Sequence, residues 1–325
     1  MAAAQGGDEA AFEALVGPHR RELHAHCYRM LGSVHDADDV LQEVLLRAWR
    51  GLGGFQGRSS VRAWLYRIAT NACLDAIESR SRRFVPVDVG PAGAGAPATE
   101  AIWVGPYPGT PAQAADEGGP AARYEQRESL ELAFVAALQY LPARQRAALI
   151  LRDVLGFSAR DAAEVLETTT AGVNSALQWA RVNAQARIPE RSQHATLRAL
   201  DDDQLRQVVG QYMRALEDAD LDAMVALLSE DATWSMPPSP HWYQGHEAIG
   251  AFLLAGPFTT RWRHIPTQAS GQPAVGCYAW DDTAGCYLGH VLDVLTFDGQ
   301  QITAVTAFID ATLFRRFGLP ARLPA

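Results

Sequence analysis

Apolar residues recur at intervals of three and four between residues 10 and 83, a pattern that predicts amphipathic helices. From Ala37 to Trp49 the apolar positions share one helical face, and the opposite face carries Asp36, Asp39, Gln42 and Glu43. A second run, from Val61 to Ile77, follows a glycine-rich loop at 51–60. We therefore expect an all-α domain over residues 10–83.

The segment from Ser158 to Arg181 has the layout of a helix-turn-helix. Ser158 is a suitable N-cap, Glu167 and Thr168 fall at the turn, and a second helix begins near Thr170. That helix directs apolar residues inward and polar residues outward, which suits contact with base edges and phosphates in the major groove. An amphipathic helix at 130–140 and a new helix after Pro142 lead into this motif, so we expect a second all-α domain over 123–192.

From Asp201 the pattern changes to two helices, at 205–216 and 221–228, and then to strand-like segments. The strands are expected at Trp234, 275–280, 287–297 and 302–309, with turns at 237–238, 281–285 and 298–299. Helices followed by an antiparallel sheet are typical of an α+β domain, which we place at 201–318. Residues 84–122 are rich in Pro, Gly and Ala and predict a linker. Within this linker one segment is apolar enough to dock on a domain, at Ile102, Trp103, Val104 and Tyr107.

Charge is distributed unevenly along the 325 residues, whose net charge is −9. Residues 1–200 hold 21 Arg and 22 acidic residues, whereas residues 201–325 hold 7 Arg and 15 acidic residues. This asymmetry indicates two different modules. The sequence has no run of 18 apolar residues and no secretory signal pattern, so we expect no membrane association.

The four cysteines show no CxxC spacing, which favours the reduced cytoplasm. Cys277 and Cys286 flank a predicted hairpin turn and could face each other, but we expect two free thiols.

The first two domains resemble extracytoplasmic-function (ECF) sigma factors of the sigma-70 family, over about 10–83 and 125–188. DADDVLQEVLLRAW at 36–49 resembles the region 2.2 surface that docks on core RNA polymerase. FQGRSSVRAWLYRIATNACLD at 55–75 resembles regions 2.3 and 2.4, which melt and read the −10 element. LPARQRAALILRDVLGFSARDAAEVL at 141–166, with the next helix, resembles region 4, which reads the −35 element.

The resemblance implies three sets of contact residues. The core-polymerase set is the face Asp36, Asp39, Gln42 and Glu43, since an acidic face suits a basic protein surface and would repel DNA. The −10 set is Phe55, Arg58, Arg62, Tyr66, Asn71, Arg80, Arg82 and Arg83, in which an aromatic ring can stack on a flipped base. The −35 set is Thr169, Thr170, Asn174, Ser175, Gln178 and Arg181.

Simpler explanations remain open for several of these residues. The acidic face could be merely solvated, Phe55 could be a local core contact, and the arginines at 80–83 could be a solvated helix end. We expect Trp64, on the apolar stripe, to be mostly core.

Three positions depart from the sigma-factor pattern. Glu167 stands where region 4 usually has Gly, and a left-handed conformation there would cost about 1–2 kcal/mol. Asn174 and Ala176 replace basic residues, which predicts weaker and less salt-sensitive DNA binding. Trp179 replaces an exposed basic residue, and we expect it to pack against the linker or the third domain.

The last third resembles SnoaL-like domains of the nuclear-transport-factor-2-like superfamily, a cone of helices over a curved antiparallel sheet. The match covers about 203–318 and rests on element order and on phrases such as LDAMVALLSEDATWSMPP. The main candidates for lining such a cavity are Trp234, His246, Trp262, His290 and Asp310, with further candidates at His241, Trp242, His264 and Tyr278. His290 with Asp310 could perform acid–base chemistry, although each His taken singly is expected to be structural. Within residues 201–325 no HxH or HxxxH spacing supports a metal site.

These observations predict an alternative sigma factor that is not an enzyme and needs no cofactor. Its expected partners are core RNA polymerase, through the beta-prime coiled coil and beta flap, and promoter DNA. The third domain is expected to modulate activity by covering arginine-bearing surfaces or by sensing a small molecule. Two alternatives stay open: a regulator fused to an active isomerase or cyclase, and a helix-turn-helix operator binder that never contacts polymerase.

Overall fold

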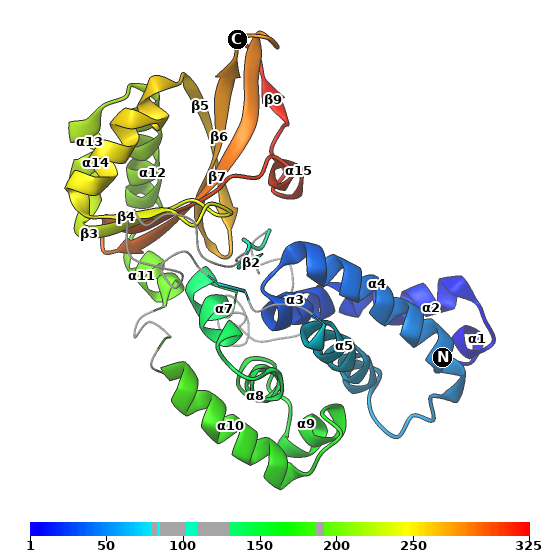
Figure 1. Cartoon of the computed structure of the whole chain (residues 1–325). Helices are drawn as coiled ribbons and strands as arrows, with labels where there is room; N and C mark the ends of the chain where they lie inside the picture. Colours follow the sequence, from blue (N-terminus) through cyan, green and yellow to red (C-terminus); the bar gives the residue numbers. More distant parts are fainter. Residues whose placement is uncertain (80–82, 85–101, 109–129, 186, 188–191) are drawn as a thin grey trace. The chain divides into compact units, whose positions relative to one another are not determined.

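The computed structural model describes residues 1–79, 83–84, 102–108, 130–185, 187 and 192–325 (Figure 1). The chain divides into two compact units. One contains Met1–Arg83 and Ala112–Pro189, and the other contains Phe84–Pro111 and Glu190–Ala325. No described helix is long and apolar enough to cross a membrane.

The first unit is helical, as the periodicity predicts. Its N-terminal part contains α1 (Ala2–Gln5), α2 (Glu9–Val16), η1 (Gly17–His19), α3 (Arg20–Leu31), α4 (Val34–Gly51), η2 (Leu52–Gly54) and α5 (Val61–Glu78). Ser33 caps α4 and Ser60 caps α5, each by accepting a backbone N–H bond from the residue three positions on. Leu23, Val44 and Leu65 are fully buried, so the apolar stripes of α3, α4 and α5 form one core.

Among the described residues, the remaining helices of this unit are α7 (Leu132–Gln139), α8 (Ala143–Leu149), α9 (Ala159–Val165) and α10 (Thr170–Gln185). Pro142 precedes α8 as predicted, and α8 continues into a π-helical turn, η5 (Ile150–Val154). The prediction that 130–140 is amphipathic is wrong. Every residue of α7 except Ala133 is buried or half-buried, because α7 packs against α3 as well as lying near α8.

The second unit contains α11 (Gln193–Ala199), α12 (Asp202–Glu217), α13 (Leu221–Leu227), α14 (Gly245–Ala255), η6 (Pro257–Thr259) and α15 (Leu313–Arg316). Its strands are β3 (Leu228–Ser235), β4 (Trp242–Gln244), β5 (Trp262–Ala269), β6 (Gln272–Asp281), β7 (Cys286–Asp298), β8 (Gln301–Phe308) and β9 (Arg322–Leu323). The main strands are ordered β4-β3-β8-β7-β6-β5, and β9 pairs with β7. α12, α13 and α14 gather beside this sheet in Figure 1, and their apolar faces share a core with β3, β6, β7 and β8.

The sheet is mixed, which corrects the prediction of a wholly antiparallel one. β3 and β8 run parallel, with Trp234 beside Val305, whereas the other pairs are antiparallel. The two cysteines of the hairpin do not face each other, because Cys277 pairs with Val291 and Cys286 pairs with Asp281. All four cysteines are free thiols, as expected.

The apolar segment within the linker docks on the second unit, which confirms the prediction from its composition. Two-residue strands β1 (Arg83–Phe84) and β2 (Ile102–Trp103) pair with each other. The Trp103 indole N–H donates to the Pro238 carbonyl at 2.7 Å. Tyr107 exchanges two hydrogen bonds with Ser270, at 2.8 and 3.0 Å, in the turn between β5 and β6.

Candidate nucleic-acid interface and ligand pocket

The helix-turn-helix is formed by α9 and α10. The Ser158 hydroxyl accepts from the Asp161 N–H at 3.1 Å and so fixes the start of α9. Glu167, in the turn, has φ of 51°, so a non-glycine residue does occupy a left-handed position where region 4 usually has Gly. Val173, Leu177 and Ala180 are buried on the inner face of α10. The whole predicted −35 set is exposed, namely Thr169, Thr170, Asn174, Ser175, Gln178 and Arg181.

Two features of α10 were missed by the sequence analysis. Trp179 is 59% exposed, so no described residue of the helical unit covers most of it, and its packing against the linker or the third domain stays a prediction. Val182, three residues further along the helix, is also 59% exposed. Arg181 is held by a two-point ion pair with Asp153, at 2.7 and 2.9 Å. This pair limits the reach of Arg181 toward a phosphate.

The acidic face of α4 is only partly exposed to solvent. Asp39 and Gln42 are exposed, whereas Asp36 and Glu43 are half-buried. Glu43 accepts from Arg47 at 2.8 Å. Leu46, which is 49% exposed on the same side as Gln42, is a feature that the sequence analysis missed. It could have been found from the pattern, since it is an apolar residue outside the buried stripe of α4.

The loop before α5 places the predicted −10 residues in different settings. Phe55 is half-buried, with its ring centroid 5.1 Å from that of Trp64, so the local-contact alternative describes its packing here. Trp64 is 6% exposed and is core, as expected. Arg58 is exposed. Arg80 and Arg82 lie outside the described residues, and Arg83 begins β1.

Arg62 and Tyr66 form a closed cluster with Glu22 and Phe157. Arg62 donates to Glu22 at 3.0 Å, and its guanidinium carbon lies 4.8 Å from the centre of the Phe157 ring. Tyr66 is fully buried, with its ring 5.2 Å from Phe157 and its hydroxyl donating to Glu22 at 3.3 Å. Burial and the Glu22 carboxylate raise the pKa of Tyr66 well above its ordinary value. In this conformation Tyr66 presents no surface to a base.

The residues around this cluster tie the N-terminal helices to α7 and α8. Arg146, which is 5% exposed, donates to the Met30 carbonyl and to the Gln139 side chain, the latter at 2.7 Å. Gln139 donates to the Arg29 carbonyl at 3.2 Å. Asn71, another predicted −10 residue, lies 3.5 Å from the Glu167 carboxylate. The helical unit is therefore closed over part of its candidate −10 surface.

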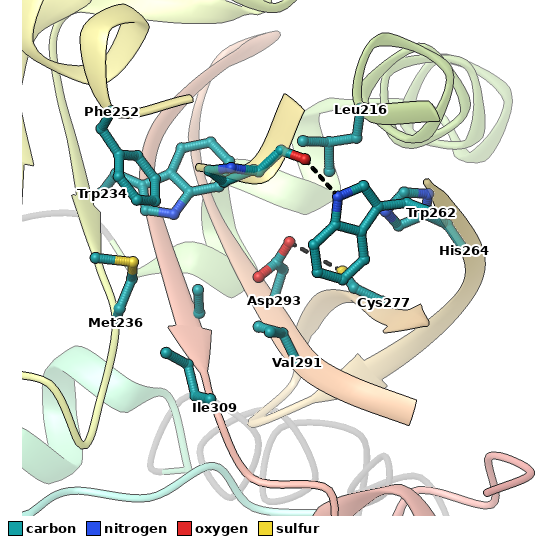
Figure 2. Close-up of a pocket in the computed structure, with 12 residues that line it drawn as sticks. Leu216, Trp234, Met236, Phe252, Trp262, His264, Cys277, Val291, Asp293 and Ile309 are labelled. Carbon is teal, nitrogen blue, oxygen red and sulfur yellow. Dashed lines mark hydrogen bonds between the residues drawn. The ribbon is translucent and has the colours of Figure 1, made fainter. Parts of the chain in front are cut away.

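The second unit contains a pocket with about 410 Å³ of empty space, its open mouth included. Side chains from α12, α14 and five strands line it, and most are apolar: Leu216, Trp234, Met236, Phe252, Pro257, Trp262, His264, Cys277, Val291, Asp293, Ala307 and Ile309. Figure 2 shows the Asp293 carboxyl beside the Trp262 ring and directed away from Val291, with one oxygen hydrogen-bonded to Cys277. An apolar lining with a single buried carboxyl is typical of a small-molecule site.

Only some of the residues predicted to line the cavity do so. Trp234, Trp262 and His264 line the pocket. His246 instead contacts the Leu228 carbonyl at 3.2 Å, and His290 is exposed on β7. Asp310 accepts from Thr312 at 2.6 and 2.9 Å outside the pocket. The acid–base pair of His290 and Asp310 is therefore not assembled here. The remaining candidates, His241, Trp242 and Tyr278, are also absent from the lining.

Asp293 is the carboxylate that the sequence analysis missed. It is 3% exposed on β7, and its Oδ2 accepts from the Tyr212 hydroxyl at 2.8 Å and from the Cys277 thiol at 3.1 Å. Burial raises the pKa of Asp293 to about 6, although both hydrogen bonds act to lower it. One signal was available: Asp293 is the single charged residue within the apolar run VLDVLTF.

Family models match three parts of the chain. Residues 15–83 match sigma-70 region 2, residues 131–183 match sigma-70 region 4, and residues 209–305 match the SnoaL-like domain. The ECF RNA polymerase sigma factor SigG of Mycobacterium tuberculosis is 42% identical over 320 residues, 96% of this chain and 85% of that protein. SigJ of the same species is 27% identical over 75% of this chain and 71% of its own length.

The crystal structure of Mycobacterium tuberculosis SigJ covers 97% of this chain and all of that chain, with a TM-score of 0.59 and 23% identity. That likeness concerns the fold. The identity to SigG, over almost the whole chain, decides the family: this protein belongs to the ECF RNA polymerase sigma factors, with a SnoaL-like domain at its C-terminal end.

Proposed function

We propose that this protein is an alternative sigma factor that binds core RNA polymerase and directs promoter-specific initiation. The observation that carries the proposal is α10, which buries Val173 and Leu177, while every side chain of the predicted −35 set, on α10 or just before it, is exposed. A helix anchored in this way can enter the major groove without disturbing its own core.

Core polymerase is proposed to bind the exposed face of α4. Asp39 and Gln42 supply polar contacts, and Leu46 supplies an apolar anchor beside them. Charge depletion at the centre and polar groups at the rim are typical of protein interfaces. Asp36 and Glu43 are assigned lesser roles, because both are half-buried and Glu43 already pairs with Arg47. The beta-prime coiled coil is the proposed partner of this face, and the beta flap is the proposed partner of region 4.

Promoter −10 DNA is proposed to contact the loop and α5 in two stages. Arg58 is exposed and available for a phosphate. Tyr66 is fully buried against Phe157 in this conformation, so it reaches DNA only after Phe157 has moved away. Arg62 is half-buried and is held by Glu22 and by the Phe157 ring. The proposal therefore requires a change within the helical unit when the promoter is bound.

The SnoaL-like domain is proposed to modulate this activity. Residues 201–325 carry 15 acidic residues against 7 Arg, so the domain repels DNA. Its apolar pocket favours ligand sensing, whereas the acid–base pair that an enzyme was expected to use is not brought together.

Substitutions in α10 test the proposed function. Asn174→Ala with Gln178→Ala is expected to lower promoter-dependent transcription by core polymerase about tenfold or more, since each lost base contact costs about 1–3 kcal/mol. The matched control is Gln185→Ala, another exposed residue of α10 outside the predicted set. Equal transcription by both variants would refute the assignment of α10 as the −35 reader.

A further inference from the structure

We propose that the pocket of the SnoaL-like domain binds an organic amine, that is, an apolar molecule of about naphthalene size with one protonated amino group. The ammonium group would bind the Asp293 carboxylate, and the apolar body would lie between the aromatic walls. The proposal concerns this domain alone, so it is tested separately from the proposed function.

The first argument is the state of the Asp293 carboxyl. Both of its side-chain hydrogen bonds end on Oδ2, from Tyr212 and Cys277. Among the described residues, Oδ1 accepts no hydrogen bond and no Arg or His forms an ion pair with this carboxyl. A buried carboxylate without a cation is costly. A ligand that brings a positive charge and an N–H donor removes that cost.

The second argument is what the surrounding donors and acceptors do. Tyr212 and Cys277 already donate to Asp293, and the Trp262 indole N–H donates to the Pro257 carbonyl at 2.7 Å. His264 meets the Glu217 carboxylate through Nδ1 at 3.1 Å, so that nitrogen carries the proton. Burial lowers the pKa of His264, which favours the neutral ring and leaves Nε2 as a buried acceptor with no described partner. His264 Nε2 and Asp293 Oδ1 are both acceptors, so a ligand with N–H donors can satisfy them.

The third argument is the chemistry of the walls. Trp234 comes from β3, Phe252 from α14 and Trp262 from β5, and they stand around Asp293 in Figure 2. The faces of aromatic rings attract cations, most strongly for Trp. Aromatic walls with one buried carboxylate therefore discriminate against carboxylic acids and phosphates, which would place like charges together.

Four ligands of nearly equal shape test the proposal on the full-length protein: 1-naphthylmethylamine, 1-naphthalenemethanol, 1-acetylnaphthalene and 1-naphthoic acid. Isothermal titration calorimetry at pH 7.5 is expected to show the amine binding at least about tenfold more tightly than the alcohol or ketone, since a charge-assisted hydrogen bond exceeds a neutral one. The acid is expected to bind most weakly. Ranking the four affinities requires only the wild-type protein, so this test does not depend on whether a variant folds.

Two variants then test whether Asp293 is the source of the preference for the amine. Asp293→Asn is expected to reduce the advantage of the amine over the alcohol to less than about threefold, because it removes the charge and keeps the shape. Asp222→Asn, at an exposed position in the first turn of α13, is the matched control and should leave the order unchanged. The proposal is overturned if the ketone binds as tightly as the amine, if Asp293→Asn keeps the preference, or if none of the four ligands binds.

Discussion

The buried carboxyl of Asp293 gives this domain a stability that depends on pH, and Asp293→Asn is expected to abolish that dependence. Asp293 has a pKa of about 6 in the folded protein, raised by burial from an ordinary value of 3.8. The folded state therefore holds its proton more tightly than the unfolded state does. Stability falls as pH rises from about 4 to about 6, and the full cost remains at higher pH.

The magnitude follows from the shift. A displacement of about 2 pKa units corresponds to about 3 kcal/mol of lost stability above pH 6. At pH 5 roughly half of that cost is already present, so the wild type should lose about 1.5 kcal/mol between pH 5 and pH 8 through this group. Asp293→Asn does not titrate. Between pH 5 and pH 8 the stability of Asp293→Asn relative to the wild type should therefore rise by about 1.5 kcal/mol. Any cost of the amide itself is the same at both pH values and does not affect this change.

Equilibrium unfolding in urea at pH 5 and pH 8 measures this difference. A brief hydrogen-exchange pulse at one fixed pH, read by mass spectrometry on peptides from β6 and β7, reports the unfolded fraction of this domain within the full chain. His264 also titrates, but it is present in both proteins and cancels in the comparison. If the difference in free energy of unfolding between the two proteins were the same at pH 5 and pH 8, the argument would be refuted.

Three further predictions follow from the helical unit. Glu167→Gly should raise the free energy of unfolding by about 0.5–1 kcal/mol, because φ of 51° suits Gly. The control Glu164→Gly, within α9, should lower it by about 1 kcal/mol. A lower melting temperature for Glu167→Gly than for the wild type would contradict this. Asp39→Arg with Glu43→Arg should abolish binding to core polymerase in a pull-down with the fold intact by circular dichroism, whereas Asp222→Arg with Glu230→Arg should bind normally. Retained binding by the first pair would mean that another face docks. Phe157→Ala should cost about 3–5 kcal/mol and speed hydrogen exchange around Tyr66, while Leu46→Ala should not; unchanged exchange would show that Phe157 does not cover that side chain.

The helical half of the fold was predictable from sequence because its information is local. Helical period, Ser caps at 33, 60 and 158, and Pro142 before α8 each act within a few residues of the structure they specify. The exposed face of α10 followed from the same period. Comparison with the family pattern singled out Glu167 as a position where a left-handed conformation would be costly, and the structure has that conformation there.

The sheet was harder to predict because its pairing is decided by distant segments. β5 has weak alternation and contains Pro266, which an edge strand tolerates because one side needs no ladder hydrogen bonds. The parallel pairing of β3 with β8 joins segments about 70 residues apart and leaves no local signal. α14 and β4 were missed as well.

The pocket residues show the same limit. His290 and Asp293 lie three residues apart on β7, a separation that places them on opposite faces of the strand, and Asp293 is on the buried face. Which face of β7 is turned toward the pocket depends on how distant strands pack around it, and the pairing of β6 with β7 also contains a register shift near Cys277. Sequence alone therefore selected the wrong polar residues for the cavity, although it selected Trp234 and Trp262 correctly.

Transcription in vitro tests the central claim most directly. Purified core RNA polymerase would be combined with the full-length protein on a library of promoter templates, with the Asn174→Ala, Gln178→Ala variant in parallel. The account predicts initiation from a subset of templates that share −35 and −10 elements, and loss of that initiation with the variant. Failure of the wild-type protein both to bind core polymerase and to initiate from any template would contradict it.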